Sequence, residues 1–164
     1  MHRLRAIALL AFVLATAPGG ASGQEHWATY ANPRFGATAD YPDDLFKVKD
    51  PPSENGDGQR FRTAGGRAEL SIYGTNNIDG EKPNVYVARH VNLDEVTYKK
   101  AAADFYVVSG TRGATIFYER CNFPNKEVLA CVYLSYPAAE RAAWDKIVAR
   151  ISTSLRHSPV SHEP

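Results

Sequence analysis

The chain has little of what marks several common protein classes. Its 164 residues include two cysteines, one methionine and no long apolar run. The longest such run, residues 6–17, has about 12 residues, whereas a membrane-spanning helix needs about 20. Lysine and arginine number 19 against 18 aspartates and glutamates. We therefore expect no membrane span, and no charge excess that would attract nucleic acid or an anionic membrane.

Catalytic signatures are also scarce. Ser109 lacks the Gly-x-Ser-x-Gly elbow of a nucleophile and falls within a predicted strand. The histidines beyond the N-terminal segment have no helical i, i+4 partner that would form a transition-metal site; they are His26, His90, His157 and His162. Several carboxylates could meet as an acid/base pair, although solvated surface charge is the default: Asp94, Glu95, Asp104 and Glu119. We expect no cofactor and no catalytic residue.

The N-terminus has the pattern of a secretory signal peptide. Arg3 and Arg5 precede the apolar run, Pro18 ends it, and the small residues Ala21-Ser22-Gly23 suit a cleavage site. We predict a signal peptide over residues 1–23, cleaved near Gly23, and a periplasmic or secreted product. The remaining 141 residues suit one domain, over residues 24–157, with a flexible tail over 158–164.

Four short runs between Val96 and Tyr136 predict an antiparallel meander. They are rich in β-branched and aromatic residues, and turn signals separate them at residues 102–104, 112–113 and 122–126. A hairpin centred on Lys126 would pair Cys121 directly with Cys131. Directly opposed residues are close enough for a disulfide, and an oxidising compartment favours one. We predict a structural Cys121–Cys131 disulfide in preference to a redox pair, because the spacing is not Cys-x-x-Cys.

The flanking segments complete an α+β fold. Residues 26–42 predict a hairpin turned at Asn32-Pro33, and residues 59–74 predict a second hairpin around Gly65-Gly66. Residues 81–92 predict a helix, and the C-terminal segment from Pro137 predicts an amphipathic helix with Trp144 on its apolar stripe. We expect a single domain: an antiparallel sheet covered by the C-terminal helix and one further helix.

Two candidate sites come from side-chain chemistry. The loop over residues 50–58 carries the oxygen donors Asp50, Glu54, Asn55 and Asp57. Its spacing misses the EF-hand rule, so a solvated turn is the alternative to a calcium site. Several of the nine tyrosines fall in predicted strands and would form a binding platform if they shared an exposed face; the candidates are Tyr73, Tyr98, Tyr106, Tyr118 and Tyr133. Ordinary cross-strand packing is the alternative.

Over most of its mature length, the chain resembles a group of short exported proteobacterial proteins without known function. The residues that carry this resemblance are Trp27, Tyr30, Asn32, Arg34-Phe35-Gly36, Tyr41-Pro42, Phe46, the run Glu54-Asn55-Gly56-Asp57-Gly58, and Phe61. More distantly, the Gly-x-x-x-x-Tyr-Pro opening, the meander and the C-terminal helix are similar to the Mog1/PsbP-like fold. That resemblance implies a scaffold used for binding, in a photosystem accessory subunit and a binder of a small GTPase among others, with no activity shared by all.

Three functional hypotheses follow. The favoured one is an exported, non-catalytic binding or accessory module for a protein, peptide or glycan of the cell envelope. The second is a cell-envelope hydrolase with an unrecognised acid/base site. The third is a structural or stress protein of the envelope whose second sheet face forms a homodimer.

Overall fold

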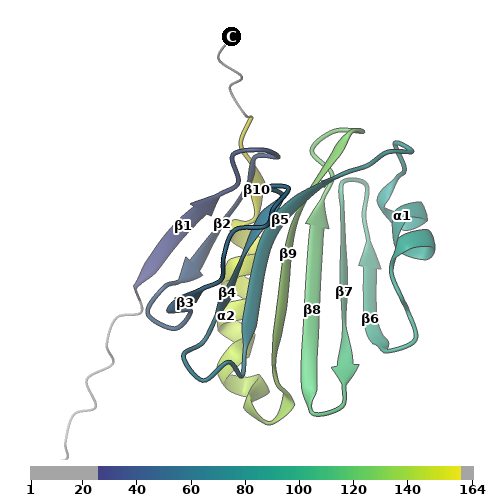
Figure 1. Ribbon diagram of the computed structural model, residues 1–164. Coiled ribbons are helices and arrows are strands. Elements are labelled where there is room, and N and C mark those ends of the chain that lie inside the picture. The colour runs from purple at the N-terminus through teal and green to yellow at the C-terminus, as the bar shows by residue number, and fades with distance from the viewer. Residues whose placement is uncertain (1–25, 160–164) are drawn as a thin grey trace, which may run out of the picture.

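The computed structural model describes residues 26–159, which form two antiparallel sheets and two α-helices (Figure 1). The predicted signal peptide, residues 1–23, lies outside this range. The large sheet has seven strands in the spatial order β3 (Val48–Lys49), β4 (Gly58–Arg62), β5 (Glu69–Asn76), β9 (Val128–Pro137), β8 (Thr115–Asn122), β7 (Phe105–Arg112) and β6 (Val96–Ala101). The small sheet has β1 (Trp27–Ala31), β2 (Ala37–Pro42) and β10 (Arg156–His157) in the order β1-β2-β10.

The predicted meander is confirmed as the four consecutive strands β6 to β9. The β8–β9 hairpin has the predicted register: Cys121 opposes Cys131, and Glu119 opposes Tyr133. The two cysteines form a disulfide across this hairpin. Since side chains alternate along a strand, this register fixes which residues of β8 and β9 share a face, and the pairings of β5 with β9 and of β7 with β8 extend the two faces to their neighbours.

One face of the large sheet is covered by α2 (Arg141–Ser154) and by the small sheet. Leu70, Val132 and Leu134 point to this side from β5 and β9 and are completely buried. From α2, Trp144 and Ile151 pack against them, and the Trp144 ring stacks on Tyr136 at 5.2 Å. The helical stripe predicted from sequence therefore faces the larger apolar core, as an amphipathic helix requires. We call this side the α2 face.

The other face carries a smaller helix, α1 (Pro83–His90), which lies near the β6 edge (Figure 1). Val87 of α1 packs with Val108, Leu129 and the disulfide in a second apolar cluster. Only eight residues long, α1 is too short to span a seven-stranded sheet. We call this side the α1 face, and part of it stays uncovered.

Two local features differ from the sequence expectation. Pro137 was expected to begin the C-terminal helix, but it ends β9, and a 3-10 turn (Ala138–Glu140) leads into α2. Strand β10, which was not predicted, pairs with β2, and Ser158 after it donates a backbone hydrogen bond to the Gly36 carbonyl. No helix within residues 26–159 is long and apolar enough to cross a membrane.

Candidate functional site

Two adjoining hollows lie on the α1 face. One has a volume of about 520 Å³ and lies over β4 and β5; the other, of about 420 Å³, lies between the sheet and α1. They share Asp57, Tyr73 and Tyr133, so they form one continuous groove. We call it the tyrosine groove, because its centre is lined by Tyr73, Tyr86, Tyr106 and Tyr133 around Glu119.

Strand register explains why these side chains meet. Tyr133 of β9 lies opposite Glu119 of β8, and Glu119 lies opposite Val108 of β7. Tyr73 of β5 lies opposite Cys131, two residues before Tyr133, and therefore shares its face. Residues from four strands thus converge on one side, while the apolar residues between them face α2.

Helix α1 adds the fourth tyrosine. Its Tyr86 ring stacks on Tyr106 at 6.1 Å between centroids and meets Phe123 edge-on at 5.6 Å. His90, one turn further along α1, lies 4.6 Å from Tyr86 between ring centroids. Such contacts hold the rings in fixed positions, so the wall of the groove is preformed.

Glu119 is the carboxylate at the centre of the groove. The Tyr106 hydroxyl donates a hydrogen bond to its Oε1 atom. Burial raises the pKa of Glu119, and the hydrogen bond from Tyr106 partly opposes that rise. Burial also raises the pKa of Tyr73 and Tyr106, with the charge of Glu119 as the next cause, so both phenols keep their protons at neutral pH.

Arg112 brings positive charge to the rim of the groove. Its guanidinium Nε donates a 2.6 Å hydrogen bond to Glu95. Burial raises the pKa of Tyr133, and the charge of Arg112 counteracts that rise. Arg112 thus neutralises Glu95 and faces Tyr133, while none of the ion pairs among residues 26–159 includes Glu119.

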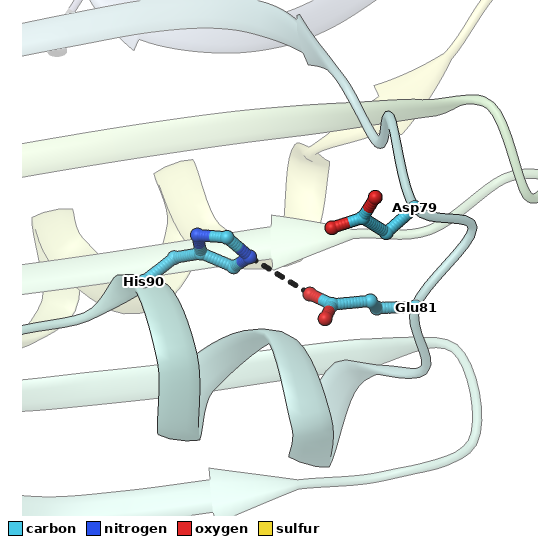
Figure 2. A group of neighbouring side chains, drawn as sticks. All are labelled: Asp79, Glu81 and His90. Carbon is cyan, nitrogen blue, oxygen red and sulfur yellow. Dashed lines mark hydrogen bonds and ion pairs between the residues drawn. The ribbon is translucent and has the colours of Figure 1, made fainter.

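A second cluster lies at the end of the groove, where Asp79 and Glu81 approach His90 (Figure 2). One ligand atom from each residue lies within 4.8 Å of the other two, and the His90 Nε2 to Glu81 Oε2 distance is 2.8 Å. An imidazole with two carboxylates is a donor set that could hold a divalent metal. Arg89, however, forms ion pairs with both Asp79 and Glu81, so the cluster already contains a cation that ties the preceding loop to α1.

The structure divides the predicted tyrosine candidates between the two faces. Tyr73, Tyr106 and Tyr133 line the tyrosine groove. Tyr98 and Tyr118 instead lie on the α2 face, where they line a separate hollow of about 440 Å³ beside α2. Tyr98 is 53% exposed, and the Tyr118 hydroxyl forms a 2.6 Å hydrogen bond with Ser152 of α2. The five candidates therefore do not form one platform.

The structure also shows where the candidate calcium loop and Ser109 lie. In the loop over residues 50–58, Asp50 accepts hydrogen bonds from Arg62, and Asp57 accepts one from Asn55. Within residues 26–159 the three-residue group with metal-ligand geometry is Asp79, Glu81 and His90, not this loop. The Ser109 hydroxyl donates a 2.7 Å hydrogen bond to a strand carbonyl.

Sequence reasoning missed two parts of the groove. Tyr86 was assigned to a helix and not counted with the strand tyrosines, and Glu119 was treated as a default surface charge. The predicted register already placed Glu119 opposite Tyr133, which was a usable signal. Nothing in the sequence indicated how far α1 would extend over the sheet.

Comparison with known proteins identifies the fold. No protein-family model matches the chain, and no curated protein sequence matches it. Among solved structures, the cyanobacterial PsbP protein CyanoP from Synechocystis sp. PCC 6803 is similar, with a TM-score of 0.58 and 12% sequence identity. The match covers 88% of this chain and 99% of that one. The chain therefore has a PsbP-like α+β fold, which agrees with the expected distant resemblance to the Mog1/PsbP-like group.

Proposed function

We propose that this protein is an exported, non-catalytic binding or accessory module, and that the tyrosine groove is its binding site. The observation that carries the proposal is the convergence of four tyrosines and one carboxylate in a preformed hollow. Tyrosines give large contact areas at low entropic cost and offer hydroxyls for hydrogen bonds, as binding surfaces require. PsbP-like architecture supports a binding scaffold without defining its ligand.

Export is the second part of the proposal. The Cys121–Cys131 disulfide suits an oxidising compartment, and the N-terminal residues have the pattern of a cleaved leader. A periplasmic or extracellular site would place the groove among envelope proteins, peptides and glycans. The occupant we expect is one of these, or a smaller molecule found in the same compartment.

Native mass spectrometry tests this function. The full chain is expressed with its own leader, purified gently from the periplasm, and weighed with and without a chelator. We expect a mass that begins near residue 24, lacks two hydrogens because of the disulfide, and carries added ligand mass. A ligand lost only on chelation would direct attention to Asp79, Glu81 and His90 instead.

Matched variants assign the ligand to a face. Tyr133→Ala, in the groove, should lose the added mass, whereas Tyr118→Phe, on the α2 face, should keep it. Retention by Tyr133→Ala together with loss by Tyr118→Phe would place binding on the wrong side of the sheet. A purified protein that turns over an envelope substrate would replace the proposal with catalysis.

A further inference from the structure

The chemistry of the tyrosine groove indicates what kind of group it accepts. The Tyr106 hydroxyl donates a hydrogen bond to one carboxylate oxygen of Glu119, Oε1. The other oxygen, Oε2, takes part in none of the hydrogen bonds or ion pairs found among residues 26–159. No buried side-chain oxygen or nitrogen in this range lacks a partner. Oε2 is therefore open to the groove.

An ionised carboxylate in an enclosed site needs a cationic partner, or it stays costly. No cation among residues 26–159 forms an ion pair with Glu119, because the nearby guanidinium of Arg112 is bound to Glu95. His90, the other basic side chain that lines the hollow around Glu119, is bound to Glu81, and Arg60 lines only the adjoining hollow over β4 and β5. Both basic groups are thus engaged with other acids, and the charge of Glu119 is left for an incoming ligand.

The rings around Glu119 suit the same partner. The half-buried rings of Tyr73, Tyr86 and Tyr133 line the hollow from two strands and a helix, and the buried Tyr106 reaches it through the hydroxyl that is bound to Glu119. Aromatic faces attract cations through their quadrupole, and cages of such rings bind ammonium groups. Arg112 makes such a contact with Phe117, with 5.4 Å between its guanidinium carbon and the ring centroid.

We propose, on the basis of the function inferred above, that the tyrosine groove binds an organic ammonium group, with Glu119 as its counter-ion and the tyrosine rings as its cage. A primary or methylated ammonium satisfies both features at once. A divalent metal would instead need several oxygen or nitrogen ligands around one point. Asp57, further along the groove, would extend recognition to ligands with a second cationic group.

The probe is choline, compared with dimethylbutanol, its neutral carbon isostere, by isothermal titration calorimetry of the full-length secreted protein at about pH 7.5. Choline should bind at least about tenfold more tightly than the alcohol, because the two differ in charge and not in shape. Equal affinities, or no binding of choline, would overturn the inference.

Two variants sharpen the result. Glu119→Gln keeps the shape and removes the charge, and should weaken choline binding about 10- to 100-fold. Asp145 is an acidic residue of α2 that lies away from the groove, so Asp145→Asn should leave choline affinity unchanged. Unchanged affinity in Glu119→Gln would contradict the counter-ion role, and circular dichroism of both variants shows whether they fold.

The pH dependence gives a further check. Choline affinity should rise with pH as Glu119 loses its proton, because burial raises the pKa of that carboxyl. The other charged or titratable side chains that line the same hollow are Asp57, His90, Arg112 and the four tyrosines. His90 lines the same hollow, so His90→Gln is measured as well. The rise should persist in His90→Gln and vanish in Glu119→Gln; the reverse would assign it to the histidine.

This outcome is separable from that of the proposed function. A neutral glycan or peptide that binds the groove while choline does not would defeat the ammonium inference and leave the binding function intact. A periplasmic ligand that stays bound in both Tyr133→Ala and Glu119→Gln would defeat the proposed function itself.

Discussion

The two faces of the large sheet are built from the same strands and yet serve different ends. The α2 face is lined mostly by apolar side chains, aliphatic and aromatic, and a fourteen-residue helix and the small sheet cover them. The α1 face interrupts its apolar cluster with tyrosines and Glu119, and an eight-residue helix covers only part of it. The difference indicates that one side is committed to stability, while the other accepts polar groups that stability alone would not select.

The largest effect on stability should come from a substitution in the core of the α2 face. Leu134 is fully buried on the α2 face, and Tyr133 beside it points into the groove. Leu134→Ala should lower the free energy of unfolding by about 2–5 kcal/mol, because it removes core contacts and leaves a cavity. Tyr133→Ala should cost clearly less in the same urea titration. Equal costs would mean that the two faces contribute alike to the core.

The disulfide should have the next largest effect. It closes a ten-residue separation between β8 and β9 and lines the groove. Replacing both Cys121 and Cys131 by serine should cost about 3 kcal/mol, chiefly by freeing the unfolded chain. Urea unfolding of the oxidised protein, the reduced protein and the double variant measures this. A double variant as stable as the oxidised protein would show that the cross-link is dispensable.

Replacing Glu119 should raise the free energy of unfolding at neutral pH, whereas the two changes above lower it. The pKa of Glu119 is raised in the folded protein, so its stabilising contribution is complete below the ordinary glutamate pKa of about 4.3 and is lost as pH rises through the raised value. Glu119→Gln should therefore be more stable than the natural chain at neutral pH, with the gain shrinking towards about pH 4. Thermal unfolding across this range tests the sign.

A glutamate that destabilises the fold and yet is required for ligand binding would be kept for function. Loss of stability in Glu119→Gln at neutral pH would instead make the residue structural. The Asp145→Asn variant, on the exposed surface of α2, controls for removal of a carboxylate outside the groove.

The smallest effect on stability should come from a change at the β6 edge of the large sheet. Tyr98 on β6 is 53% exposed, and its neighbours Lys99 and Lys100 also lie at the surface. Tyr98→Ala should change the free energy of unfolding by less than about 0.5 kcal/mol. Sedimentation of the natural chain and this variant at high concentration shows whether two copies associate through this edge, as distinct from the sheet face that the homodimer hypothesis names. A dimer that Tyr98→Ala dissociates would make β6 an interface.

Alternation and turn chemistry made much of the fold predictable. The runs between Val96 and Tyr136 gave the meander, and the spacing of Cys121 and Cys131 gave the β8–β9 register. The apolar stripe with Trp144 gave α2. These features are local, or they depend on a single hairpin, so sequence periodicity is enough to find them.

The groove was less predictable because it depends on contacts between distant segments. Tyr73 and Tyr133 share a face only because β5 pairs with β9, and a pairing across about 60 residues leaves no periodic signal. Tyr98 and Tyr118 were grouped with them although the β6–β7–β8 register directs both to the α2 face. A bulge between Val96 and Tyr98 shifts that register, and composition does not reveal it.

The nine tyrosines allow one direct test of the difference between the faces, because they are distributed over both sides. Carbon-13 labelled tyrosine rings are observed by NMR while the periplasmic ligand, or choline, is added to the full-length secreted protein. The account predicts shifts for Tyr73, Tyr86, Tyr106 and Tyr133, with Tyr98, Tyr118 and Tyr136 unchanged. Shifts confined to the latter three would place the binding site beside α2 and contradict it.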